Sequence, residues 1–496
     1  MEEKQMVRGA GILMAITSLP SSYGIGTIGE AAYHFIDLLV DLKQRYWQIL
    51  PIGPTSYGDS PYQSFSAFAG NPYLIDLDLL KKEQLLLDEE IRGVYWGNDE
   101  RDIDYATLYE NRVKVLKKAY QRFDMESTDF LQFKEVHTDW LRDYSFFMAL
   151  KTFSGNREWH RWEAGLRDRE EAVMEKYRKR LAQEIDFWNF CQYKFFSQWA
   201  ELKQYANSRG VQIIGDIPLY VALDSADVWA DRKLFELAHD GTPKCVAGTP
   251  PDYYAGDGQI WGNPLYDWKH MEQDGFLWWK KRIKLAAELF DVVRIDHFIG
   301  VLRYYSIPFG KEDARLGKWR KGPGKKLTDV IDSVLGDCHI IAEDLGTPVP
   351  GAKKLLKRMG WLGIKVLMLA FDGDTQNENL PHNYQETNLV VYAGTHDNDT
   401  IVGYYRDKTE YELAYLYEYM NITSKDELPD AFIRLSYASI ADVVIVQMQD
   451  VLKLGNEARM NQPSTVGHNW RWRVGQHSIT EERRTWIRTI ATVYRR

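Results

Sequence analysis

Short apolar runs recur along the whole chain, and each ends at glycine, proline or a charged residue. Amphipathic stretches with helical spacing separate these runs. Runs of this length predict buried strands, and strands that alternate with helices are typical of a parallel sheet covered by helices. Eight such strands predict a (β/α)8 TIM barrel. The predicted strands span residues 12–16, 46–50, 211–217, 292–296, 339–343, 364–369, 389–393 and 442–446.

The predicted strands are very unevenly spaced. The connections after the second and third strands, about 52–200 and about 218–288, are far too long to be loops. We therefore expect one barrel domain over residues 1–496, with these two insertions forming subdomains around the carboxyl-terminal face of the barrel. Within the first insertion the residue pattern predicts helices over 114–121 and 167–196.

The charge balance narrows the class of ligand. Lys and Arg number 62 against 71 Asp and Glu, a formal net charge of −9. Nucleic acids and anionic membranes select basic surfaces, so neither is expected as a partner, and a neutral or cationic ligand fits better. Aromatic residues reach 14%, with 17 Trp and 30 Tyr. Because planar rings stack on the apolar faces of sugars and bases, an aromatic-lined groove is expected.

The cysteines and the N-terminal segment bear on location. Cys191, Cys245 and Cys338 are far apart and lack C-x-x-C spacing, so neither a disulfide framework nor a zinc site is expected. The segment before the apolar run at 11–16 carries no net positive charge, unlike a secretory signal. No stretch approaches the roughly 20 apolar residues of a membrane span. A cytoplasmic protein without an obligate protein partner is expected.

Two segments resemble cofactor motifs but lack a required residue. Residues 24–29 match G-x-G-x-x-G after the first strand, yet the next strand ends at 50–54 without the carboxylate that would hold a ribose. Residues 372–377 begin like a calcium loop but lack glycine at the sixth position. We therefore expect neither a nucleotide nor a metal cofactor.

Acidic residues follow several of the predicted strands. In barrel enzymes the carboxyl ends of the strands meet at one mouth, where the chemistry takes place. Asp is also common as a helix N-cap in such loops, and this structural role is the alternative for each residue taken singly. Four together, with Arg294 and His396 beside them, favour a site, because clustered carboxylates repel one another and cost stability. The four are Asp216, Asp296, Glu343 and Asp397.

Two of these carboxylates differ in their surroundings. Strand alternation places Arg294 on the same face as Asp296, and an adjacent guanidinium keeps a carboxylate charged. Glu343 follows an apolar run, and burial without a cation raises the pKa of a carboxyl group towards that of a useful general acid. One ionised nucleophile and one protonated acid are what retaining glycoside chemistry requires, so Asp296 and Glu343 are predicted for these roles.

The strand-end segments resemble the short regions shared by the α-amylase clan: RIDH at 294–297, AEDLG at 342–346, THDND at 395–399 and GDIP at 215–218. The chain further resembles the 4-α-glucanotransferases (amylomaltases, disproportionating enzymes) of glycoside hydrolase family 77, from about residue 10 onwards. That resemblance is carried by SLPS at 18–21, GDSPYQSFSAFAGNP at 58–72, GTPPDYYAGDGQIWGNPLY at 248–266, EARMNQP at 457–463 and NWRWR at 469–473.

The resemblance implies a function. Asp296 would be the nucleophile, Glu343 the acid/base, and Asp397 the carboxylate that holds hydroxyls of a distorted donor sugar. Segments of an α-1,4-glucan would pass from one malto-oligosaccharide, starch or glycogen chain to the 4-hydroxyl of another glucan or of glucose, without a cofactor. A loop at 248–266 would close over the glucan, and no C-terminal β-domain is expected. The expected substrate-binding residues are Tyr62, Asp216, Gln259, Trp261, Arg294, His297 and His396.

The aromatic residues divide into two groups. Tyr62 lies in a polar turn and Trp261 between glycines, so both rings are expected to face substrate. Trp278 and Trp279 follow a helical pattern, so they are expected in the core or on a helix face, and Trp47 lies within a strand and is expected in the core.

Two alternatives to a transferase stay open on the sequence. One is an α-1,4-glucan hydrolase of the same clan, because the sequence does not determine whether a sugar or water accepts the glucosyl group. The other is a catalytically silent glucan-binding protein. The presence of Asp296, Glu343 and Asp397 together argues against the silent protein, because a chain without catalytic duty would be free to lose one of them.

Overall fold

The structure, a computed structural model, describes residues 6–251 and 256–496. Eight parallel strands form one sheet in the order β10-β11-β12-β1-β2-β3-β6-β9. A parallel bridge between Ile341 and Leu362 joins β9 to the chain just before β10 and closes the barrel. The predicted TIM barrel and all eight predicted strands are confirmed. The strands are β1 Gly9–Leu13, β2 Tyr46–Gln48, β3 Gln212–Ile217, β6 Val292–Ile295, β9 His339–Ala342, β10 Gly363–Val366, β11 Leu389–Tyr392 and β12 Val443–Gln447.

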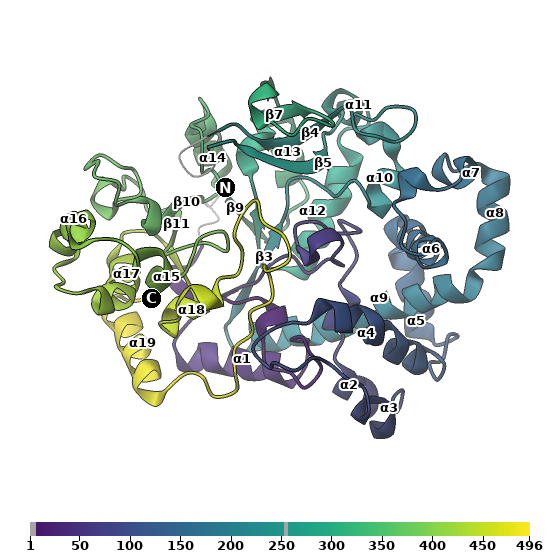
Figure 1. The fold of residues 1–496 in the computed structure, drawn as a ribbon, viewed down its shortest axis with the longest axis horizontal. Helices are drawn as coiled ribbons and strands as arrows, with labels where there is room; N and C mark the ends of the chain where they lie inside the picture. Colours follow the sequence, from purple (N-terminus) through teal and green to yellow (C-terminus); the bar gives the residue numbers. More distant parts are fainter. Residues whose placement is uncertain (1–5, 252–255) are drawn as a thin grey trace.

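Helices pack around the barrel (Figure 1). The barrel residues are buried on both faces, as expected for a parallel sheet covered by helices. Trp47 in β2 and Trp279 in α12 are fully buried, which confirms their predicted core positions. Helices in the connections between barrel strands, and after the last strand, are α1 Glu30–Asp41, α9 Ala182–Ser208, α12 Leu277–Leu289, α13 Lys325–Asp332, α14 Ala352–Met359, α15 Ile401–Tyr405, α16 Glu410–Met420, α17 Leu428–Ala438, α18 Met448–Val451 and α19 Glu481–Val493.

The connection from β2 to β3 is mainly helical and extends to one side of the barrel (Figure 1). The helix predicted at 114–121 is the end of α4, and the stretch predicted as helical over 167–196 is mostly helical but is divided between α8 and α9. Arg169 takes a positive φ of 58° and turns the chain after α7, and a second break at Leu181 separates α8 from α9. The helices before α9 are α2 Leu77–Lys82, α3 Asp88–Arg92, α4 Tyr105–Tyr120, α5 Thr128–Val136, α6 Thr138–Phe153, α7 Ala164–Arg167 and α8 Glu171–Arg180.

A second, antiparallel sheet stands beside the barrel mouth, and the hydrophobic pattern did not predict it. Its order is β5-β4-β7-β8. The loop expected at 248–266 is therefore partly strand, although residues 252–255 lie outside the described residues. Glycines and polar residues interrupt these segments, so they lack the alternation that marks a strand. The strands are β4 Cys245–Thr249, β5 Gln259–Pro264, β7 Arg303–Pro308 and β8 Lys318–Lys321, and α10 Ala226–Ala230 and α11 Trp268–Gln273 flank β4 and β5 in the sequence.

The residues predicted at the ends of strands mostly lie just beyond them. Asp296 follows the last residue of β6, and Glu343 follows the last residue of β9. The backbone N–H of Glu343 still donates to the carbonyl of Ile295, at 3.1 Å. The ladder therefore fixes where these two side chains leave the barrel. Across the described ranges no helix combines the length and the apolar character needed to cross a membrane.

Candidate active site

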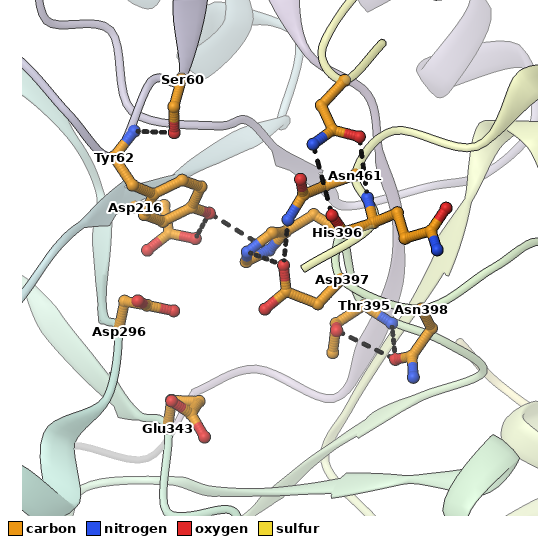
Figure 2. Close-up of polar contacts among 12 residues, drawn as sticks. Ser60, Tyr62, Asp216, Asp296, Glu343, Thr395, His396, Asp397, Asn398 and Asn461 are labelled. Atoms are coloured by element: carbon orange, nitrogen blue, oxygen red, sulfur yellow. Dashed lines mark hydrogen bonds and ion pairs between the residues drawn. The ribbon is translucent and has the colours of Figure 1, made fainter. Parts of the chain in front are cut away.

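The four predicted carboxylates meet at the carboxyl ends of the barrel strands. Asp216 lies within β3, Asp296 follows β6, Glu343 follows β9, and Asp397 lies in the loop after β11. Figure 2 shows the side chains of Asp296, Glu343 and Asp397 around one open space, with Asp216 above Asp296 and next to Tyr62. The structure thus brings together four carboxylates that span 181 positions of the sequence, from Asp216 to Asp397.

A buried arginine joins the first two carboxylates. Arg294 and Asp216 are register partners across β3 and β6, which places their side chains side by side. Arg294 Nη1 donates to Asp216 at 2.8 Å (Oδ1) and 2.6 Å (Oδ2), and to Asp296 Oδ1 at 2.8 Å. Arg294 and Asp216 are almost wholly buried, whereas the Asp296 side chain is 25% exposed. One guanidinium therefore fixes Asp296 at the mouth and supplies its counter-ion.

Glu343 is held by backbone N–H groups, and no cationic side chain among the described residues forms an ion pair with it. Its Oε2 accepts from the backbone N–H of His297 at 2.6 Å, and its Oε1 from that of Leu345 at 3.1 Å. The N–H of His297 reaches Glu343 because His297 takes a left-handed conformation, φ 50°, directly after Asp296. Burial, with the charge of Asp296 in addition, raises the pKa of Glu343 to about 8. Glu343 is therefore protonated at neutral pH. The apolar residues before it in the sequence predicted this rise in its pKa.

Tyr62 and His396 form one wall of the site. Their rings stack with centroids 4.6 Å apart. The Tyr62 hydroxyl donates to Asp216 Oδ2 at 2.9 Å and lies 3.1 Å from His396 Nδ1. The ring of Trp470 packs against both Tyr62 and His396. Tyr62 is thus at the mouth, but His396 covers one ring face, so Tyr62 is part of a fixed polar network rather than a free platform.

Asp397 lies across the mouth from Asp296 and is the most exposed of the carboxylates, with half of its side chain accessible. Its Oδ1 accepts a hydrogen bond from Asn461 Nδ2 at 2.7 Å and lies 3.4 Å from His396 Nε2. Asn461 belongs to the segment after the last barrel strand. In Figure 2 Asn461 lies next to His396 and Asp397, away from Asp296.

Gln259 and Trp261 lie on β5 and contact each other. The indole N–H of Trp261 donates to Gln259 Oε1 at 3.0 Å. The Trp261 ring packs edge-on against His297 with centroids 4.7 Å apart, and also against Tyr220. Although glycines flank Trp261 in the sequence, its ring has packing neighbours, because β5 pairs with β4 and lies against the residues that follow β6. Burial lowers the pKa of His297 to about 4, so its ring is neutral beside the nucleophile.

Three residues at the site were missed by the analysis of strand ends. They are Asn461, Arg459 and Trp470, all from the chain beyond β12. Two of the five segments that carried the family resemblance, 457–463 and 469–473, contain them, and this was the available signal. No periodicity or strand position marked them, because they reach the site from an irregular segment.

The two cofactor-like segments have structural explanations. A Cβ at Gly26 would lie 1.9 Å from the carbonyl oxygen of Ile16, so glycine there allows the chain to pack on itself. In the other segment, Asp372 accepts from the backbone N–H of Asp374 at 3.0 Å, a local turn bond. Among the residues that the structure describes, no group of three or more His, Cys, Asp or Glu side chains is arranged to hold a metal ion.

The comparisons with known proteins agree with one another. A model of glycoside hydrolase family 77, described as 4-alpha-glucanotransferase, matches residues 14–478. The chain is 46% identical over 488 residues to a 4-alpha-glucanotransferase of Clostridium butyricum, covering 97% of this chain and 100% of that protein. It is 43% identical over 493 residues to a 4-alpha-glucanotransferase of Streptococcus pneumoniae, covering 99% and 97%. Amylomaltase from Streptococcus agalactiae in complex with acarbose matches the structure with a TM-score of 0.95 and 41% identity, over 99% of each chain.

Proposed function

The chain belongs to the 4-alpha-glucanotransferases of glycoside hydrolase family 77, and we propose that Asp296, Glu343 and Asp397 carry out its transfer of α-1,4-glucan segments. The observation that carries the assignment is the contrast between two neighbouring carboxyl groups. Asp296 is paired with a guanidinium, whereas Glu343 has a pKa raised to about 8. An ionised and a protonated carboxyl group together supply both partners of a double displacement.

In the first step a carboxylate oxygen of Asp296 attacks the anomeric carbon of the donor. The bond between that carbon and the glycosidic oxygen breaks, and Glu343 gives its proton to the departing oxygen. The products are a glucan released with a free 4-hydroxyl, a glucosyl ester on Asp296 and an ionised Glu343. The pKa of Glu343 suits this donation, because the group is still protonated at neutral pH.

In the second step the roles reverse. The 4-hydroxyl of an acceptor sugar gives its proton to Glu343 and attacks the anomeric carbon, which restores the Asp296 carboxylate. Transfer rather than hydrolysis requires that the acceptor is positioned and that water is kept from the ester. His297 follows the nucleophile in the sequence and the Trp261 ring packs on His297, so these are the two groups proposed to exclude water there.

The remaining residues bind the donor sugar. Asp397, half exposed at the mouth, is placed to accept hydrogen bonds from two sugar hydroxyls, and His396 supplies a ring nitrogen beside it. Tyr62, fixed by Asp216 and His396, borders the donor sugar as part of this polar network. Donors and acceptors are then malto-oligosaccharides, glucose, and starch-type or glycogen-type chains.

The surroundings of the site support one further set of inferences. Cys191, Cys245 and Cys338 carry free thiols, which suits a reducing compartment such as the cytoplasm. All the groups named for catalysis come from this chain, and we propose no obligate protein partner. We treat the chain as one catalytic barrel whose insertions, about 52–200 and 218–288, supply Tyr62 and Trp261 to the cleft.

The direct test is to incubate the purified protein with maltotriose alone. A transferase produces longer and shorter oligosaccharides together with glucose, without a net gain of reducing ends. A hydrolase raises the number of reducing ends steadily, and a silent binding protein leaves maltotriose unchanged. The Asp296→Asn variant, prepared in the same way, shows that any products come from this site.

A further inference from the structure

One arginine outside the barrel contacts three parts of the Asp397 region at once. Arg459 Nη2 donates to the backbone carbonyl of Asp397 at 3.0 Å, and Nε donates to the carbonyl of Asn461 at 2.7 Å. Its Nη1 lies 3.7 Å from Asp399 Oδ2. All three nitrogens of the guanidinium are therefore engaged, each with a different residue.

We propose that Arg459 is a positioning residue for Asp397, with Asp399 as its anchor. The proposal rests on the role of Asp397 under the proposed function. Arg459 holds the backbone on both sides of the contact between Asn461 Nδ2 and Asp397 Oδ1, which measures 2.7 Å. Since the Asp397 side chain is half exposed, the barrel residues alone leave it free to change rotamer. The bonds from Arg459 to the carbonyls of Asp397 and Asn461 select one orientation.

The anchor is itself rigid. Asp399 is nearly buried, and its Oδ2 accepts from Asn456 Nδ2 at 2.6 Å. Its Oδ1 accepts from the backbone N–H of Thr400 at 2.7 Å. A Cβ on Gly403 would lie 2.5 Å from the same Oδ1, so glycine there is required for the close approach. The bond between Asp399 and Asn456 thus connects the loop after β11 to the start of the 456–461 segment. The bond from Arg459 to the Asp397 carbonyl is a second connection between the same two segments.

The geometry requires arginine rather than any cation. The three acceptors lie in three directions around one planar group, and a guanidinium presents donors in such a fork. The ammonium of lysine is a single point and cannot reach both carbonyls and the carboxylate from one place. Replacing Arg459 with lysine keeps the positive charge but loses the bond to the Asn461 carbonyl. Asn461 is then less firmly placed, and so is the Asp397 side chain that it contacts.

A double-mutant cycle tests the proposal. Arg459→Lys should lower kcat by up to about tenfold with little change in KM, no more than the loss of Asn461 itself, measured with α-maltosyl fluoride in both backgrounds and with maltotriose as well in the wild-type background. In an Asp397→Ala background, assayed with α-maltosyl fluoride to keep the rate measurable, Arg459→Lys should change the rate by less than about twofold, because nothing remains to be positioned. Asp399→Asn should repeat the pattern with a smaller loss.

The matched control is Arg471→Lys. Arg471 pairs with Asp102, lies in the same C-terminal segment and touches none of the catalytic carboxylates. The proposal is overturned if Arg459→Lys costs the same factor in both backgrounds, or if Arg471→Lys reproduces the loss of kcat. If Asp397→Ala itself keeps wild-type activity, the proposed function of Asp397 fails instead. Thermal unfolding of each variant separates a loss of folded protein from a loss of kcat.

Discussion

The two sides of the active site are built in different ways. On the barrel side, Asp296 and Glu343 directly follow β6 and β9, and their partners come from those strands and the residues just after them. On the opposite side, Asp397 lies in a loop, and its partner Asn461 is 64 residues away in the sequence. The side chain of Asp397 is also twice as exposed as that of Asp296, 50% against 25%.

The two sides have different proposed tasks: the barrel side makes and breaks bonds, and the loop side holds the sugar. The groups that exchange a proton and a covalent bond must keep fixed positions and pKa values, and the paired strands provide both. The group that holds sugar hydroxyls must meet a substrate that enters and leaves, and a loop tied down by another segment can be partly solvated. Changes on the barrel side should therefore abolish chemistry, whereas changes on the loop side should weaken it by degrees.

The largest effect is expected for Asp296→Asn. The amide keeps the shape but cannot form the glucosyl ester, so kcat should fall by more than about 10⁴-fold. The control is Asp291→Asn at the other end of the same strand, where the carboxylate accepts from the backbone N–H of Ile213. The control should keep kcat per folded molecule. Initial rates with maltotriose measure both, and near wild-type turnover of Asp296→Asn would reject the nucleophile.

Glu343→Gln comes next and isolates the proton transfer. Turnover of maltotriose should fall by about 10²- to 10⁴-fold, because the leaving oxygen is no longer protonated. Reaction with α-maltosyl fluoride should still load Asp296, since fluoride leaves without a proton. The labelled enzyme can be detected by intact-protein mass spectrometry. If the fluoride reacts no faster than maltotriose in this variant, Glu343 is not the acid.

The raised pKa of Glu343 also predicts two pH dependences. The kcat/KM for glucans should decline as pH rises through about 8, where the acid ionises. The folded pKa lies above the value of 4.5 for an unperturbed Glu, so this group stabilises the fold fully below pH 4.5. That contribution is lost as pH rises to about 8. The Tm of Glu343→Gln should therefore decrease less between pH 5 and 8 than that of the wild type, and parallel Tm curves would contradict the prediction.

On the loop side, Asp397→Asn and Asn461→Ala should differ from each other. Removing the carboxylate should cost about 10²- to 10³-fold in kcat/KM, because its hydrogen bonds with the sugar strengthen in the transition state. Removing only its partner should cost about tenfold, the equivalent of about 1.4 kcal/mol. Equal losses in the two variants would show that Asp397 has no function without Asn461. They would contradict the expectation that changes on the loop side weaken activity by degrees.

The smallest effect is expected for Trp261→Ala. The ring beside His297 is expected to keep water from the ester, so its removal should raise the share of hydrolysis several-fold while total turnover falls modestly. Trp278→Phe, a half-buried ring that packs on Phe68, is the control. The rate of reducing-end release measures hydrolysis, and the rate of oligosaccharide exchange measures transfer. An unchanged ratio of hydrolysis to transfer would assign Trp261 to substrate binding alone.

Local periodicity explains why so much of the barrel side could be predicted. Alternation along β6 puts Arg294 and Asp296 on one face, and this needs only the two-residue repeat of a strand. The apolar residues before Glu343 indicated burial, and the pKa follows from burial. Residues outside regular strands gave no such pattern, and the antiparallel sheet that carries Trp261 was therefore missed.

The sequence by itself determined the eight strands, the carboxylates at their ends and the pairing of Arg294 with Asp296, since these depend on neighbours within a few residues or on the closure of a repeated unit. Only the tertiary structure decided that Asn461 and Arg459 hold Asp397, and that Trp261 packs on His297. Such contacts join segments far apart in the chain. Their formation depends on the path of irregular connections, and no local repeat encodes that path.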